Sequence, residues 1–259
     1  MSSTRRVLRY ALSDVIRRRW VLAYALFFAG VTEGLLWLGG GGSRVAVSLL
    51  DVVLLIIPLV SIAFSTLYVY NAQGFLELLL SQPVSRRGLY FSIWVALVLP
   101  LIAAFVIGVG IPLALAGEPS AVTCTMIGTG AALTIIFVAL GLAIASSLPD
   151  RIKGLGLAVG AWLATTVVYD GLVLILATML GARSAAAPVL SALALNPVDL
   201  ARALLLTQLD APALMAYSDA VMQRLIGGQM VVLVTAVGLA MWCVVPTALG
   251  LRAFRRRDW

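Results

Sequence analysis

The chain has 259 residues, of which 62% are apolar and 11% charged, and a formal net charge of +7. Soluble domains average about 25% charged residues, so this composition, with a mean hydropathy of +1.08, excludes a soluble enzyme, a disordered chain and a disulfide scaffold. It predicts an all-α membrane protein that crosses the bilayer several times.

The N-terminal segment is basic and amphipathic, and we expect it to form a helix over residues 4–19. Apolar pairs such as Val7 and Leu8 recur every four residues, while arginines including Arg5 and Arg9 occupy the opposite face. Basic amphipathic helices beside a membrane span lie in the plane of the interface. The pattern therefore predicts an in-plane elbow helix, the alternative being an N-terminal extension of the first span.

Six apolar stretches follow, and each is long enough to cross a hydrocarbon core about 30 Å thick. The first contains Glu33 and the fifth contains Asp170, whereas each of the other four includes a long stretch without charge. Asp51 begins the second span and is expected to lie at the interface. We predict six transmembrane helices at about residues 20–38, 49–70, 89–116, 121–147, 155–180 and 226–250.

The basic residues divide unevenly between the two sides that six spans define. Most of the 18 Lys and Arg residues flank the spans on the side of the two termini, including the runs 17–19 and 255–257. Cytoplasmic flanks are enriched in Lys and Arg, so we expect both termini to be cytoplasmic. Because the arginines lie mostly at span ends, the positive charge indicates topology and not nucleic-acid binding.

Residues 72–87, between the second and third spans, are expected to leave the membrane plane on the cytoplasmic side. A short helix is predicted from Gln73 to Ser81, whereas residues 148–154 are expected to be only a turn. Apolar residues at i, i+3 and i+4 are typical of a helix that binds in a partner's groove. The alternative is that these residues pack against the chain's own spans. The candidate partner-binding residues of this coupling segment are Phe75, Glu77, Leu78, Leu79, Arg86 and Arg87.

A long outer connection, residues 181–225, is predicted to be a helical loop that rests on the membrane face of the bundle. In it, Asn196 can cap a helix, Pro197 suits the first helical position and Asp199 lies in the positively polarised first turn. A second short helix is expected to begin near Asp210.

Two of the acidic residues within predicted spans, Asp170 and Glu33, are candidates for an intramembrane function. Asp170, which follows Tyr169, lies well inside the fifth span, where an ionisable group costs about 3 kcal/mol and normally faces the protein interior or a cavity. We expect it either to face a cavity or a second subunit, or to be protonated or hydrogen-bonded within one bundle. Glu33 lies near the outer end of the first span and either shares such a function or only reaches the interface.

The sequence lacks the residues that catalysis, metal binding or nucleotide binding would need. There is no histidine, which excludes Ser-His pairs, His-bound zinc and His-ligated haem. Lys153 is the single lysine and is followed by glycine, whereas a phosphate-binding loop ends in Gly-Lys-Ser or Gly-Lys-Thr. We therefore expect no catalytic, cofactor or metal site in this chain.

Several of these features occur together in one known family. They are the basic in-plane helix, the six spans, the stretch Leu-Glu-Leu-Leu-Leu-Ser-Gln-Pro-Val-Ser-Arg at 76–86, Tyr169-Asp170, Asn196–Asp199 and the basic end of the last span. The chain resembles the permease subunits of type-2 ABC exporters, and within them most resembles the NosY group of permeases from transporters that mature nitrous oxide reductase. One departure is at residues 71–75, which lack the acidic run that the family has before the glycine.

The resemblance implies the type-2 ABC exporter permease architecture in the bacterial inner membrane. Two permease copies, in a homodimer rather than a heterodimer, would join two cytoplasmic ATPase subunits that alone bind ATP and Mg. The resemblance further implies a periplasmic accessory partner and export of a sulfur species for copper-site maturation. The alternatives are a lipid, drug or peptide exporter permease and a membrane scaffold without transport. An intramembrane enzyme is disfavoured because the sequence has no histidine and no clustered acids.

Overall fold

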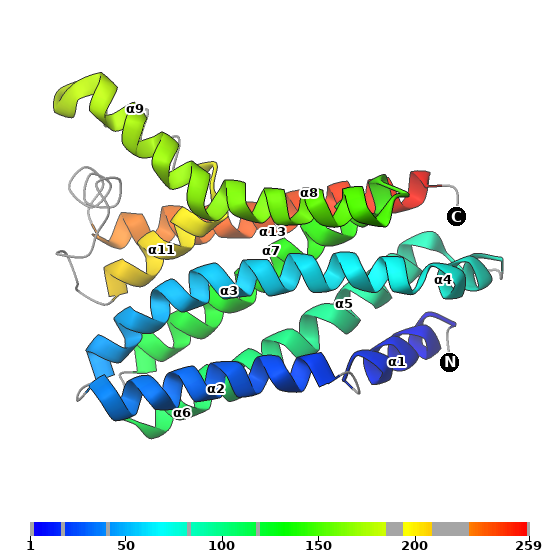
Figure 1. The fold of residues 1–259 in the computed structure, drawn as a ribbon, viewed down its shortest axis with the longest axis horizontal. Coiled ribbons are helices and arrows are strands. Elements are labelled where there is room, and N and C mark those ends of the chain that lie inside the picture. Colours follow the sequence, from blue (N-terminus) through cyan, green and yellow to red (C-terminus); the bar gives the residue numbers. More distant parts are fainter. Residues whose placement is uncertain are drawn as a thin grey trace.

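The protein is a bundle of helices that run roughly side by side (Figure 1). This computed structural model describes residues 3–16, 19–39, 42–81, 84–117, 120–184, 194–208 and 228–257. In those ranges every regular element is an α-helix or a π-helix (η). The elements are α1 (Ser3–Ile16), α2 (Arg19–Gly39), α3 (Gly42–Asn71), α4 (Gln73–Leu80), α5 (Arg86–Phe105), η1 (Val106–Gly110), α6 (Ile111–Leu115), α7 (Ser120–Ser147), α8 (Arg151–Leu163), η2 (Ala164–Val168), α9 (Tyr169–Ser184), α11 (Pro197–Gln208) and α13 (Gly228–Arg256).

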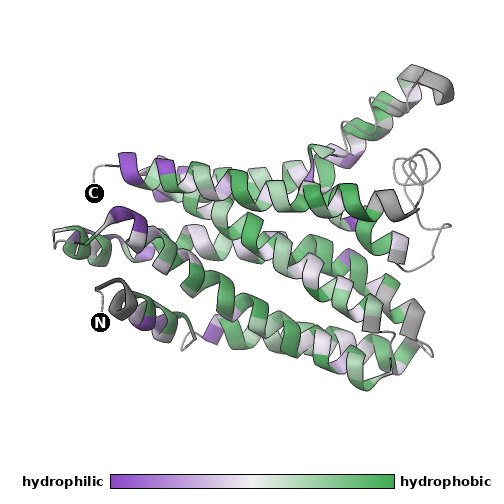
Figure 2. Ribbon diagram, turned by 180° about the vertical axis from the view of Figure 1, so that it is seen from behind, coloured by the Kyte–Doolittle hydropathy of each residue, from purple (hydrophilic) through white to green (hydrophobic). Residues whose placement is uncertain are grey.

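Six stretches of the described helices are long and apolar enough to cross a membrane. They are Arg19–Leu38, Val47–Asn71, Arg86–Leu115, Ala121–Ser147, Arg151–Val173 and Val232–Arg256. This result confirms the predicted all-α membrane protein with six transmembrane helices. Figure 2 shows hydrophilic residues concentrated at the end of the bundle that carries both termini, and apolar residues along most of the length of the helices.

Two spans belong to helices that begin earlier than the hydropathy pattern predicted. The helix α3 begins at Gly42, not near residue 49. The helix α8 begins at Arg151, because the Asp150 carboxylate accepts hydrogen bonds from the backbone N–H groups of Ile152 and Lys153 at 2.8 and 3.3 Å. Such a cap satisfies N–H groups that the first turn of a helix leaves without partners. Residues 151–154, predicted to belong to a turn, therefore form the first turn of α8.

The helix α7 lies within the bundle and contacts α3, α5, α11 and α13. It approaches α3 closely at Gly141, whose carbonyl oxygen accepts a hydrogen bond from Thr66 Oγ1 at 3.3 Å. A Cβ atom at Gly141 would lie 2.6 Å from the backbone oxygen of Ile62, a separation well inside van der Waals contact. The crossing of α3 and α7 therefore requires glycine at this position.

The helix α11 is packed into the bundle, which corrects the prediction that the outer helices rest on its membrane face. It contacts α13, α7 and α3, and Val198, Leu200 and Ala201 are buried on different sides of it. Apolar residues surround too much of this helix for one face to bury them, so it gains more by lying between other helices. The second helix expected near Asp210 lies outside the described residues.

The fifth span is interrupted by a π-helical turn, which the sequence pattern did not predict. The turn η2 separates α8 from α9, and Figure 1 shows α9 turning away from the line of α8 at this point. A π-helical turn disturbs the regular hydrogen-bond ladder, and such turns are frequent at bends and at functional sites. The bend therefore marks the part of the fifth span that contains Asp170.

Candidate functional site

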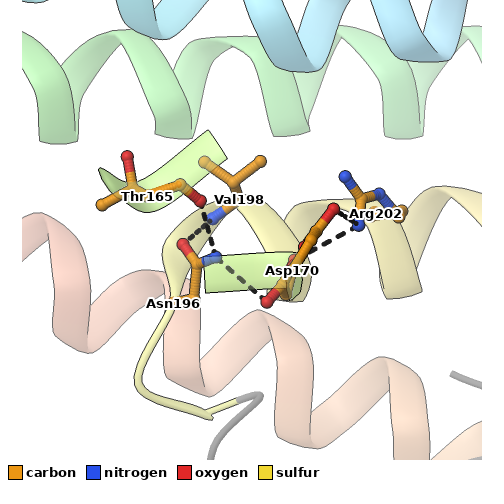
Figure 3. Close-up of polar contacts among 6 residues, drawn as sticks. Thr165, Asp170, Asn196, Val198 and Arg202 are labelled. Carbon is orange, nitrogen blue, oxygen red and sulfur yellow. Dashed lines mark hydrogen bonds and ion pairs between the residues drawn. The ribbon is translucent and has the colours of Figure 1, made fainter. Parts of the chain in front are cut away.

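Polar side chains from two helices meet where the fifth span bends (Figure 3). Asp170 is the second residue of α9, directly after η2, and Arg202 lies in the second turn of α11. Arg202 Nη1 donates a hydrogen bond to Asp170 Oδ2 at 2.8 Å and lies 3.4 Å from Asp199 Oδ1. One guanidinium therefore joins a carboxyl group of the fifth span to a carboxyl group of α11.

Asn196 connects this ion-pair cluster to the π-helical turn. Its side-chain amide donates one hydrogen bond to Asp199 Oδ2 at 3.0 Å and another to the backbone oxygen of Thr165, in η2, at 2.8 Å. Its Oδ1 accepts from the backbone N–H of Val198 at 3.1 Å, which caps the start of α11. The predicted cap is confirmed, and the same side chain also fixes α11 to the bend of the fifth span.

The charged groups of the cluster differ in how far they are buried. The side chains of Asp199 and Arg202 are 5% and 20% exposed, whereas that of Asp170 is 39% exposed. Buried charges require close pairing because desolvation is costly. Burial, and then the neighbouring Asp170 carboxylate, raise the pKa of Asp199 to about 8. At neutral pH Asp199 therefore holds its proton, and the ion pair of the cluster lies between Arg202 and the partly exposed Asp170.

The cluster can hold α9 and α11 in one relative position or release them. Its ion pairs and hydrogen bonds are short-range, so a shift of α9 along α11 must break them. Among the described residues, no three His, Cys, Asp or Glu side chains converge on a position that could hold a metal ion. The chemistry that the arrangement offers is therefore the making and breaking of polar contacts between two helices.

The structure brings together most of the polar residues that the sequence singled out outside the coupling segment. Asp170, Asn196 and Asp199 contact one another or Arg202, Tyr169 lies next to Asp170 with partial burial, and Pro197 begins α11. Glu33 is exposed on α2 and does not join them.

Arg202 is the residue of the cluster that the sequence analysis did not single out. The available signal was its spacing from Asp199. The two residues are three positions apart, and side chains at i and i+3 share one helix face. An arginine on the same face as an acid of an apolar helix forms a polar stripe. Such a stripe indicates that another helix supplies a further acidic partner.

The coupling segment divides into residues that the chain covers and residues that it leaves accessible. The ring of Phe75 stacks on Tyr10 of α1 with centroids 5.3 Å apart, and Leu79 packs against the core. Leu78 is 68% exposed, and Glu77 beside it is exposed as well. The alternative prediction was that these residues pack against the chain's own spans. It holds in part, since Leu79 and one face of Phe75 pack within this chain.

Arg86 lies in α5 and contacts the end of the last helix. Its Nη1 donates hydrogen bonds to the backbone oxygens of Arg255 and Arg257 at 2.7 and 3.1 Å. Carbonyl groups at the end of a helix have no partners within the helix and attract cations. Arg86 is thus engaged within the chain, while Arg87, the next residue of α5, is exposed.

The fold and the site together define a membrane permease, with six apolar spans, a polar cluster inside the bundle and a short helix at the end that carries both termini. Residues 46–259 match the family described as ABC-2 family transporter protein, and the chain belongs to this family. It is a transmembrane permease subunit of an ABC transporter, as predicted. Permeases of this family work with an ATPase partner.

Two relatives share most of the length of the chain. One, from Pseudomonas aeruginosa, is described as Probable ABC transporter permease protein NosY and is 28% identical over 273 residues, which cover 97% of each chain. The other, from Stutzerimonas stutzeri, carries the same description and is 27% identical over 222 residues, which cover 78% of this chain and 80% of the relative. The predicted resemblance to the NosY group of permeases is confirmed.

Proposed function

We propose that the chain forms the membrane pathway of an ATP-driven exporter whose separate ATPase subunits bind α4 in the cytoplasm. The observation that supports this proposal is the position and surface of α4. It lies outside the six candidate spans, at the end of the bundle that carries both termini (Figure 1). Its apolar Leu78 is 68% exposed in the described part of the chain, next to the exposed charge of Glu77.

The inward face of α4 explains how movement of an ATPase would reach the spans. Leu76 is fully buried, Leu79 packs against the core, and Phe75 stacks on Tyr10 of α1. The helix α1 in turn contacts α5, the first helix of the third span. A force applied at Leu78 is therefore transmitted through packed side chains to α1 and the third span, which suits a coupling helix.

The test is association with the ATPase subunit of the same transporter. Leu78→Asp should weaken co-purification about tenfold, as expected for the loss of a central apolar contact, and Glu77→Arg should weaken it through the charge. Ile152→Asp is the matched control, because Ile152 is an apolar residue 83% exposed at the start of α8. Equal effects of Leu78→Asp and Ile152→Asp, or normal association of both α4 variants, would contradict the assignment of α4.

A second copy of the chain completes the pathway in this proposal. The helix α8 exposes Gly156 and Gly160, and Ala164 follows at the same four-residue spacing in η2. Among the described residues, no atom from outside the adjacent turns of the same helix lies within 4 Å of a Cβ atom built at Gly156 or Gly160. Small residues at this spacing let two membrane helices approach closely, which favours a homodimer through the fifth span.

For the cargo, we infer a sulfur species exported for copper-site maturation of nitrous oxide reductase. The similarity to the NosY relatives over nearly the whole chain supports this inference. In this arrangement the protein lies in the inner membrane with cytoplasmic termini, and a periplasmic accessory protein binds the outer end near α11.

Complementation tests the cargo. A denitrifying host that lacks its own permease should regain copper-loaded nitrous oxide reductase when it expresses this chain with its ATPase. Failure to regain copper, with the ATPase still bound and active, would indicate a lipid, drug or peptide cargo. Restoration by a variant whose ATPase cannot hydrolyse ATP would indicate a scaffold without transport.

A further inference from the structure

An apolar groove of about 610 Å³ lies between α2 and α3 and is also lined by α5 and the start of α8. This volume is within the range of about 300–1,000 Å³ that is usual for sites of small molecules. The apolar lining comes from both helices, and includes Val21, Phe27, Ile56, Leu59, Ala63 and Phe64.

The polar residues of the groove are gathered at one end. Trp20 lies at the start of α2, Asn71 ends α3 and Arg151 begins α8, and all three line the groove. These three helix ends lie toward the end of the bundle that carries both termini (Figure 1). The groove is therefore amphipathic along its length, with a cation and an indole at one end and apolar side chains beyond them.

Arg151 is available to an anion from outside the chain. Within the described part of the chain it forms no ion pair, whereas its neighbour Lys153 lies 4.0 Å from Asp150. Arg151 is also exposed. A guanidinium can bind a phosphate oxygen through two N–H groups, so the end of the groove suits a phosphate.

The length of the groove fits one acyl chain. Its lining on α3 extends from Ile56 to Asn71, which is about 22 Å at 1.5 Å per residue. One leaflet contributes half of a hydrocarbon core of about 30 Å. The groove is therefore long enough for the acyl chain of a phospholipid whose head group remains at the level of Arg151.

We propose that this groove binds an anionic phospholipid from the leaflet on the side of the two termini, with one acyl chain between α2 and α3 and the phosphate on Arg151. Tryptophan prefers the level of lipid head groups, which places Trp20 beside the head group. A helix of a second copy is the competing occupant of the apolar walls, and the cysteine crosslink described below tests for it. The lipid satisfies both parts of the groove, and this assignment does not depend on the cargo of the transporter.

The test uses the permease with its ATPase in nanodiscs that contain phosphatidylglycerol or phosphatidylcholine with a photoreactive diazirine in mid-chain. Peptides of α2 and α3 that line the groove should be labelled more strongly by phosphatidylglycerol. Arg151→Gln should lower this preference about fivefold, the effect of one interfacial cation. Lys153→Gln, the matched control outside the groove, should leave the preference unchanged. Ala63→Trp or the milder Ala23→Leu should reduce labelling by both lipids, because each fills the groove.

Three results would overturn the proposal. The first is labelling spread evenly over all lipid-facing helices. The second is an unchanged lipid preference in a folded Arg151→Gln variant. The third is disulfide formation between two copies that carry Ala63→Cys, which would show that the second copy occupies the groove. If Ala63→Trp does not fold, Ala23→Leu decides whether filling the groove displaces the acyl chain.

Discussion

At the scale of single residues, Arg202 holds the candidate site together. It lies 2.8 Å from Asp170 and 3.4 Å from Asp199, so its loss leaves two carboxyl groups without their shared cation. Loss of one carboxyl group, in contrast, leaves a balanced pair. Removing the arginine and removing the Asp170 carboxylate should therefore lower the free energy of unfolding by different amounts, although both remove the contact between Asp170 and Arg202.

We expect Arg202→Met to lower the free energy of unfolding by about 3 kcal/mol, the cost of leaving a buried charge unpaired. Asp170→Asn should lower the free energy of unfolding by less, because Asp170 is partly exposed and Arg202 still has Asp199 as a partner. The double variant should be more stable than the sum of the two single effects predicts, since residues in one ion-pair network couple. Thermal unfolding of the detergent-solubilised protein measures all three. Strictly additive effects would show that the pair does not contribute to stability.

The sequence predicted Asp170 as a special residue but did not predict its partner. An acid inside an apolar span is visible from composition alone, because its burial is costly wherever the span packs. Its partner Arg202 is 32 residues away, in a segment expected to lie outside the bundle. Such a contact depends on how α11 packs, and hydropathy contains no information about that.

At the scale of helices, the structure is determined by close approaches as well as by hydropathy. The six spans could be predicted because each must be apolar to enter the membrane. The π-helical turn η2 could not, since Ala164–Val168 contains no proline or glycine to mark a bend. The start of α8 depends on the Asp150 cap, and hydropathy contains no information about such a cap.

Two glycines of α7 provide a matched test of helix packing. Gly141→Ala should destabilise the protein by about 1–3 kcal/mol through overpacking, because a Cβ atom there meets the α3 backbone. Gly128→Ala should be neutral or stabilising by up to about 1 kcal/mol, because no described atom of another helix lies within 4 Å of its Cβ position. Thermal unfolding compares them. Similar destabilisation of both variants would mean that α3 and α7 are not held by this crossing.

At the scale of the whole molecule, charge and architecture agree on one orientation. Both termini and α4 lie at the same end of the bundle (Figure 1), where Figure 2 shows the hydrophilic residues concentrated. Basic residues flank spans on the cytoplasmic side. The proposed ATPase contact on α4 requires this end to be cytoplasmic, so the proposed orientation and the proposed coupling depend on each other.

Single cysteines at positions 2 and 259, in a chain with Cys124→Ala and Cys243→Ala, test the orientation. In intact cells, neither cysteine should react with a maleimide that cannot cross the inner membrane. Both should react once that membrane is permeabilised. Labelling of either terminus in intact cells would reverse the orientation and remove α4 from the cytoplasm.

The central claim is that an ATPase drives this permease through α4, and photo-crosslinking at position 78 tests it most directly. A photoreactive amino acid in place of the exposed Leu78 should form an adduct with the ATPase in cells. The same amino acid in place of Ile152, which is even more exposed and lies at the same end of the bundle, should form little adduct. We expect the adduct at position 78 to dominate. An ATPase adduct at position 152 with none at position 78 would contradict it.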